Sequence, residues 1–219
     1  MIKTGELFSL EETVAGDFLA RCEYPWQALK DVKSFITETG HKLDKSEFTE
    51  ASPEVWIHKD AKISPTAYIG APCIIGRNTE VRHCAFIRGS ALIGENCVIG
   101  NSTEVKNSII FNCVQIPHYN YVGDSILGYK SHLGAGVVTS NVKSDKSLIK
   151  VKNGKEIIET GLRKFGAMIG DGVEVGCNSV LNPGTVIGKN TNIYPLSRVR
   201  GVIKENSIYK AENNITEKR

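Results

Sequence analysis

Several polar side chains near the middle of the chain have the chemistry of proton transfer and anion binding. His118 stands between a proline and two tyrosines in the stretch VQIPHYNYVGDSILGYKSHLGAG, residues 114–136. An imidazole titrates near neutral pH, so His118 is a candidate general base, and Glu104 is a candidate carboxylate to orient it. Arg88 and Lys106 are two cations in the same part of the chain, and such a pair suits a phosphate group. A purely structural histidine is the alternative.

The elements that would position these side chains follow a six-residue repeat. An aliphatic residue recurs at every sixth position from Ile57 to Val105 and again from Ile169 to Ile193, with two five-residue steps between Val105 and Leu127. A small residue stands four positions after most of them. A sustained period of six fits neither an α-helix nor a simple strand. It predicts an all-β solenoid, a parallel β-helix in which three hexads close one triangular coil around stacked aliphatic side chains.

This geometry brings distant residues together. Residues separated by three hexads, as Arg88 and Lys106 are, lie on adjacent coils, roughly 4.8 Å from one another. Arg88 and Lys106 should therefore point outward from one face, where two stacked like charges repel. A phosphate between them would remove the repulsion, and splaying of both chains into water would also do so. His118 follows about two-thirds of a coil later, in a cluster with Tyr121 and Asn141.

The repeat occupies residues 53–203, and three other segments accompany it. Residues 1–52 predict a helical segment that caps an end or a side of the prism, with a capping box from Ser9 to Glu12 and a second amphipathic stretch that ends near Gly40. Residues 142–166 break the repeat and are rich in lysine, so we expect an external loop with a functional role. Residues 204–219 predict a polar tail, frayed or weakly helical.

The bulk composition excludes several classes of protein. The net charge of +3 is small and suggests no nucleic-acid or membrane footprint, because proteins with such partners usually show clustered Lys/Arg. No apolar run is long enough to span a bilayer, and the first residues lack the apolar core of a signal peptide. The six cysteines form no C-x-x-C pair, which disfavours a zinc ribbon and indicates reduced thiols. Cys73 and Cys97 occupy small-residue positions and should pack in the core. We expect a cytoplasmic protein without nucleic-acid or membrane partners.

Two stretches resemble a known family. FIRGSALIG (residues 86–94) and EVKNSIIFNCVQIPHYNYVGDSILGYKSHLGAG (residues 104–136) are similar to the hexapeptide-repeat acyltransferases. The likeness is to the acetyltransferase half of bifunctional UDP-N-acetylglucosamine pyrophosphorylases and to archaeal-type sugar-1-phosphate nucleotidylyltransferases. It implies a left-handed solenoid, a homotrimer with sites between neighbouring prisms, and acetyl-CoA as co-substrate with no metal required. The implied reaction is N-acetylation of an amino sugar phosphate, with glucosamine-1-phosphate as the first candidate.

The resemblance also implies roles for individual residues. His118 matches the general base and Glu104 matches the acidic residue near it. The remaining matches would bind the amino sugar phosphate (Arg88, Lys106, Tyr121 and Asn141) or acetyl-CoA (Ala135 and Cys177). Lys150 matches no family position, but it lies near the place of a family lysine and is a further candidate to bind the acceptor.

The chain departs from the family pattern at three points. His132 stands where the family usually has asparagine, and Ser147 stands where it has a lysine. No counterpart of the Gly-rich nucleotidyltransferase domain is present in this sequence. We therefore predict no uridylyl transfer by this chain, and a separate nucleotidyltransferase is a candidate partner.

Two other functions stay open at this point. A zinc carbonic anhydrase of the hexapeptide class needs three histidines around one metal, and His83 and His118 have nearly the right separation, but the third position is Gly123. A non-catalytic sugar-nucleotide-binding or scaffold subunit would keep the phosphate clamp without turnover. The substitutions at His132 and Ser147 fit that second alternative.

Overall fold

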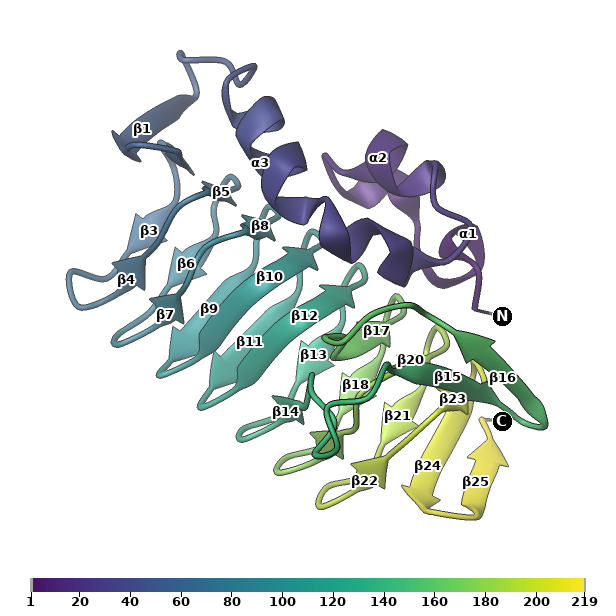
Figure 1. Cartoon of the computed structure of the whole chain (residues 1–219). Coiled ribbons are helices and arrows are strands. Elements are labelled where there is room, and N and C mark those ends of the chain that lie inside the picture. Colours follow the sequence, from purple (N-terminus) through teal and green to yellow (C-terminus); the bar gives the residue numbers. More distant parts are fainter. Residues whose placement is uncertain (1, 219) are drawn as a thin grey trace.

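Short strands, each with an inward aliphatic residue of the repeat, wind into a parallel β-solenoid, with helices along one side of it (Figure 1). The computed structural model describes residues 2–218. Strand registers confirm the predicted coil, because Ile57 pairs with Ile75 and Ile75 with Ile93, each partner lying three hexads further along the chain. The predicted all-β solenoid is thus confirmed.

Each coil contributes one strand to each of three walls. The first wall contains β2 (Val55–His58), β5 (Cys73–Ile75), β8 (Ala91–Ile93), β17 (Ala167–Ile169), β20 (Thr185–Ile187) and β23 (Val202–Ile203). The second wall contains β3 (Lys62–Ile63), β6 (Glu80–Val81), β9 (Val98–Asn101), β11 (Gln115–His118), β13 (His132–Leu133), β18 (Glu174–Val175), β21 (Asn192–Ile193) and β24 (Ser207–Ala211). The third wall contains β4 (Tyr68–Ile69), β7 (Phe86–Ile87), β14 (Val138–Thr139), β19 (Val180–Leu181) and β22 (Arg198–Val199).

Two longer strands turn a corner without a break. β10 (Glu104–Ile110) and β12 (Tyr121–Leu127) begin on the third wall and end on the first. They coincide with the two five-residue steps of the repeat, and Val105 pairs with Val122, a separation just short of three full hexads. Each of two successive coils is therefore shortened by a single residue at this corner. We call the place where the third wall meets the first, at Asn107, Asp124 and Asn141, the tight corner.

The first wall has an apolar outer face as well as an apolar inner face. From β2 to β20 its outward residues form one continuous ladder and are buried: Trp56, Ile74, Leu92, Ile109, Ile126, Met168 and Val186. The N-terminal segment covers them, since α3 (Val32–Gly40) packs on β5, β8 and β10, and the 3-10 helix η2 (Pro25–Lys30) packs on β12. Each large side chain buried in this way contributes about 2 kcal/mol. The segment thus covers a side of the prism, one of the two predicted placements.

The N-terminal helices are shorter than predicted. The stretch after Ser9 is a 3-10 turn, η1 (Leu10–Glu12), followed by α2 (Gly16–Ala20), so the single helix expected there is wrong. Ser9 makes no cap: its backbone N–H and its hydroxyl both donate to Asp171 Oδ2, each at 2.8 Å, on a distant coil. A tertiary hydrogen bond has replaced the local one. A further helix, α1 (Thr4–Leu7), precedes these elements, and α3 ends at Gly40 as expected.

Three β-hairpins replace segments predicted to be helical or irregular. β1 (Phe48–Ser52) pairs antiparallel with β2 at the first coil, within the segment predicted to be helical. β15 (Lys150–Asn153) and β16 (Glu156–Glu159) form a hairpin in the external loop. β25 (Asn214–Glu217) pairs with β24, so the tail is a hairpin rather than a frayed helix. In each hairpin the backbone N–H and C=O groups find hydrogen-bond partners that an isolated polar segment would lack.

The buried cysteines pack as predicted. Cys73 and Cys97 are almost fully buried in the solenoid, and burial raises the pKa of both thiols, that of Cys97 to about 12. All six cysteines are free thiols. None of the helices within residues 2–218 combines the length and the apolarity that a membrane span needs.

Candidate functional site

The predicted site residues gather around the third wall of the middle coils. Arg88 follows β7, and Lys106 lies one coil along on β10, because Arg88 N–H donates to Val105 O across the same ladder. Tyr121 pairs with Glu104 in the next step of the ladder. Four predicted residues therefore occupy three successive strands of one wall. Arg88 and Lys106 stack at the predicted three-hexad spacing, whereas Glu104 and Tyr121 are one residue closer in sequence.

Each cation of the predicted clamp has a carboxylate partner from its own chain. Arg88 Nη1 lies 2.7 Å from Glu104 Oε1, and this contact raises the pKa of the guanidinium. Lys106 Nζ lies 3.2 Å from Asp124 Oδ2. Carboxylates that alternate with cations relieve the repulsion, so neither a bound anion nor splaying into water is needed to explain the stack. Glu104, predicted to orient the general base, contacts Arg88 instead.

Asp124 is the centre of a hydrogen-bond network at the tight corner. Its carboxylate is almost fully buried and accepts hydrogen bonds from Lys106 Nζ, from Asn107 Nδ2 at 2.8 Å and from the Asn141 side-chain amide. Asn107 and Asp124 both have positive φ, of 45° and 49°, which asparagine and aspartate tolerate better than most residues. The missing residue of each five-residue step thus produces a corner that aims three polar side chains at one carboxylate.

Tyr121 joins this network from the third wall. Asn141 Nδ2 donates to its hydroxyl oxygen at 3.2 Å. Burial raises the pKa of Tyr121, and the negative charges of Asp124 and Glu104 raise it further. The phenol is therefore neutral at pH 7 and keeps its proton for donation to a ligand. The predicted acceptor-binding residues Lys106, Tyr121 and Asn141 form one connected group.

His118 lies around a different corner of the same coil. It ends β11 on the second wall, pairs with Asn101, and precedes the turn at Tyr119 and Asn120 that leads to Tyr121. Its side chain is exposed, and within residues 2–218 no group forms a hydrogen bond with the imidazole. The base and the cations thus come from adjacent walls rather than from one.

The residues predicted to meet acetyl-CoA continue the column that His118 begins. Gly136 N–H donates to His118 O at 3.0 Å, and Asn178 N–H donates to Ala135 O at 2.8 Å. His118, Ala135 and Cys177 therefore stand at the same corner position of three successive coils. Cys177 is exposed, and among the described residues nothing accepts a hydrogen bond from Ala135 N–H. We call this the base column.

Lys150 does not join the group around Asp124. It lies on β15, where its Nζ is 2.6 Å from Glu159 Oε1. It lines a cavity of about 150 Å³ between the hairpin and the later coils, together with Lys143, Lys152, Pro183, Arg200 and Gly201. Ser147 accepts a hydrogen bond from Lys143 and does not substitute for a lysine at the tight corner. The hairpin packs against the later coils of the solenoid, where β15 contacts β23.

His132 has a structural partner. Its Nδ1 lies 2.7 Å from Glu174 Oε2 on the neighbouring coil of the second wall. His83 likewise contacts the hydroxyls of Ser64 and Thr66. Among the described residues, no three His, Cys, Asp or Glu side chains converge as metal ligands do.

Asp124 and Asn107 were missed as site residues in the sequence analysis. The signal was available, because residues 17 apart stack across each five-residue step: Lys106 pairs with Gly123 and Ser108 with Ser125, so Asn107 and Asp124 fall on adjacent coils. In the sequence analysis, stacking on adjacent coils was considered only for the two cations, Arg88 and Lys106. The five-residue steps on which both residues lie also marked the corner.

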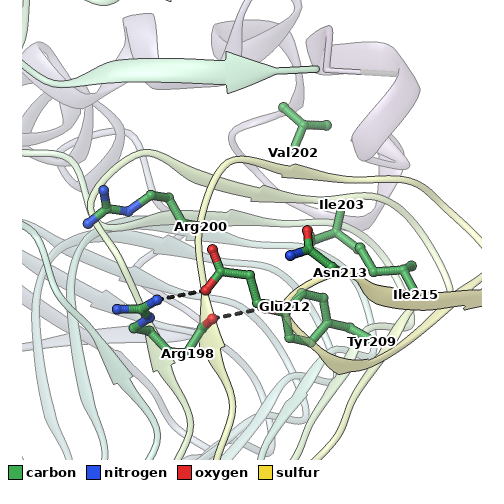
Figure 2. Close-up of a pocket in the computed structure, with 8 residues that line it drawn as sticks. All are labelled: Arg198, Arg200, Val202, Ile203, Tyr209, Glu212, Asn213 and Ile215. Atoms are coloured by element: carbon green, nitrogen blue, oxygen red, sulfur yellow. Dashed lines mark hydrogen bonds and ion pairs between the residues drawn. The ribbon is translucent and has the colours of Figure 1, made fainter. Parts of the chain in front are cut away.

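A larger cavity lies at the C-terminal end of the solenoid (Figure 2). Its volume is about 300 Å³, and it is closed by the turn between β24 and β25. Arg198 pairs with Glu212 at 2.6 Å, and the Tyr209 hydroxyl donates to Arg198 O at 2.9 Å (Figure 2). None of the predicted site residues lines this cavity.

The chain matches two family models. Residues 54–89 and 166–201 match the bacterial transferase hexapeptide (six repeats), and residues 85–154 match the GMPPB C-terminal domain. The solenoid is built from hexapeptide repeats. Such repeats form left-handed β-helices, so the predicted fold class and the predicted resemblance are both confirmed.

Curated relatives are bifunctional enzymes. "Bifunctional protein GlmU" of Methanococcus aeolicus is 32% identical over 196 residues, which cover 87% of this chain and 47% of the relative. A "Bifunctional sugar-1-phosphate nucleotidylyltransferase/acetyltransferase" of Sulfurisphaera tokodaii is 38% identical over 142 residues, covering 65% of this chain and 35% of the relative. The chain thus spans about a third to a half of the length of these relatives.

Among solved structures, the acetyltransferase domain of PglB from Neisseria gonorrhoeae in complex with acetyl coenzyme A is similar over 74% of this chain and 56% of that one. Its sequence identity is 15% and its TM-score is 0.33. A score this low does not bear on function.

Proposed function

We propose that the chain transfers the acetyl group of acetyl-CoA to the amine of an amino sugar phosphate, with glucosamine-1-phosphate as the first candidate. The product would enter UDP-N-acetylglucosamine synthesis in the cytoplasm. The names of the bifunctional relatives support an acetyltransferase that acts on sugar phosphates. The observation that carries the proposal is the arrangement of the two groups of residues: the base column stands one short wall away from the Lys106–Tyr121–Asn141 group.

The acceptor would bind on the third wall. Arg88 and Lys106 would hold its phosphate, because both already point outward from adjacent strands. The phosphate would compete with Glu104 and Asp124 for these cations, and a dianion with three acceptor oxygens can do so. Tyr121 and Asn141 present a phenol and an amide to sugar hydroxyls.

His118 would act as the general base. It takes a proton from the ammonium or the attacking amine, because only the free amine is a nucleophile. The amine then adds to the thioester carbonyl, and the Ala135 N–H donates to the oxyanion that forms. Collapse of this intermediate breaks the C–S bond, and CoA leaves with the proton. No covalent enzyme intermediate is needed.

A homotrimer would complete the site. Large apolar side chains are exposed on the third wall and at its corner with the second: Tyr68, Phe86, Tyr119, Val180, Tyr194 and Leu196. Exposed apolar side chains on one wall favour burial against another copy of the chain. Such packing would bring the base column of one prism toward the third wall of the next. Light scattering after size exclusion checks the assembly.

The test is release of CoA thiol from acetyl-CoA with a panel of amino sugar phosphates. We expect turnover that requires a primary amine and a phosphate on the acceptor. Thiol release at the same slow rate with and without any acceptor would contradict the proposal.

A non-catalytic subunit that binds sugar nucleotides is the second candidate. The departures from the family pattern at His132 and Ser147 favour it. Calorimetry separates the two functions: this candidate predicts binding of glucosamine-1-phosphate without affinity for acetyl-CoA.

A further inference from the structure

We propose that the N-terminal segment, residues 2–46, fixes the geometry of the acceptor site at the tight corner. Asn107 and Trp26 would be positioning residues that act through Asp124 and Asn141. This inference rests on the proposed function, which assigns Asn141 and Lys106, both hydrogen-bonded to Asp124, to acceptor binding. It goes beyond a cap on the solenoid, since the segment would determine how well the acceptor binds.

The first connection runs through Asn107. Its side-chain amide donates to Leu29 O at 3.3 Å and to Asp124 Oδ1 at 2.8 Å. One amide group thus joins η2 of the N-terminal segment to the carboxylate that also holds Lys106. Because Asp124 is almost fully buried, its orientation depends on these few partners.

The second connection runs through an aromatic pair. The rings of Trp26 and Phe165 stack with centroids 5.6 Å apart, and both side chains are buried. Phe165 N–H donates to Asn141 O at 3.0 Å, and the next residue, Gly166, donates its N–H to Asp124 O at 2.8 Å. The Trp26 ring therefore braces the backbone at the point where the external loop leaves and rejoins the solenoid.

Other ties of the same segment avoid this corner. Ser9 bonds to Asp171 on a later coil, and Thr37 Oγ1 donates to Glu54 Oε1 at 3.1 Å near the first coil. The base column also lies at the opposite end of the third wall. The effect of Asn107 and Trp26 should therefore be confined to the acceptor, and binding of acetyl-CoA should not change.

The experiment compares variants that remove one tie at a time. Asn107→Gly removes the amide at a position where glycine accepts the φ of 45°. Trp26→Leu removes the aromatic contact, Trp26→Phe retains a ring, and Ser9→Ala is the matched control that loses a different side-chain tie. The measurements are KM for glucosamine-1-phosphate, KM for acetyl-CoA, and hydrogen exchange of the Phe165 and Gly166 amides, with the melting temperature as a check on folding.

We expect Asn107→Gly and Trp26→Leu to raise the KM for glucosamine-1-phosphate about tenfold and to leave the KM for acetyl-CoA unchanged. The two amides should exchange about tenfold faster, and Trp26→Phe should restore both values. Ser9→Ala should alter neither. Equal changes in both KM values, or unchanged exchange at Phe165 and Gly166, would overturn the inference. A wild-type protein that releases no thiol would instead refute the proposed function, while the exchange measurement would still test the brace.

Discussion

Lys106 Nζ and Asp124 Oδ2 lie 3.2 Å apart, with 17% and 5% of the two side chains exposed. This ion pair bridges two coils at the tight corner. It is far less accessible to water than the neighbouring Arg88–Glu104 pair, where 47% and 29% of the side chains are exposed. The two pairs therefore have different consequences when one partner is removed.

Asp124→Asn should destabilise the fold by about 3 kcal/mol, because it leaves the ammonium of Lys106 buried without a counter-charge. Asparagine keeps the side-chain volume and tolerates the positive φ, so the loss reports the charge. Urea unfolding measures it. The matched variant Glu104→Gln breaks the exposed pair and should cost less than about 1 kcal/mol. Equal losses of unfolding free energy in the two variants would contradict the claim that burial makes the Lys106–Asp124 pair the more costly one to break.

Arg88→Ala should raise the KM for the amino sugar phosphate by about 10- to 100-fold, the effect of losing a charge-assisted contact to phosphate. The KM for acetyl-CoA should stay the same. Arg82→Ala is the control, because Arg82 also pairs with a carboxylate, Glu80, at 2.9 Å, but on the second wall. If both arginine variants bind the acceptor as wild type does, the phosphate lies elsewhere.

The thiols should react with iodoacetamide in two classes. Cys84 and Cys177 are exposed and should be alkylated in the folded protein, whereas Cys73 and Cys97 are buried and should be protected. Burial raises the pKa of Cys97 to about 12, so the buried, protonated thiol contributes its full share to the free energy of unfolding below the unfolded-state pKa, about 8.5. This contribution is lost as the pH rises toward the folded-state pKa, so alkali should destabilise the protein. Mass spectrometry of native and denatured samples gives the result; early alkylation of Cys97 would contradict the packing.

The coil architecture could be predicted from sequence because hexad spacing maps directly onto stacked strands. The registers of Ile57, Ile75 and Ile93 follow the repeat without adjustment. The clamp residues were placed on one wall for the same reason. Ile74 and Leu92 also indicate that the first wall is covered from outside, because an outward position that is apolar in successive coils has to be shielded from water.

The remaining features depended on contacts distant in sequence. Ser9 looked like a helix cap, and only the fold brings Asp171 within reach of its hydroxyl. The polar tail carries no strong strand pattern, but β21 offers it an open edge to pair with. Lys150 is close to Asn141 in sequence but does not join its network, because Lys150 begins the β15–β16 hairpin and its side chain pairs with Glu159 on the other strand.

The most direct test of the central claim is the turnover of His118→Ala with acetyl-CoA and glucosamine-1-phosphate. The matched control is His83→Ala, an exposed histidine two coils earlier in the same column of the second wall. The account predicts that His118→Ala lowers kcat about 100-fold or more, as loss of a general base does, while His83→Ala keeps wild-type turnover. Equal thiol release by wild type and His118→Ala would contradict it.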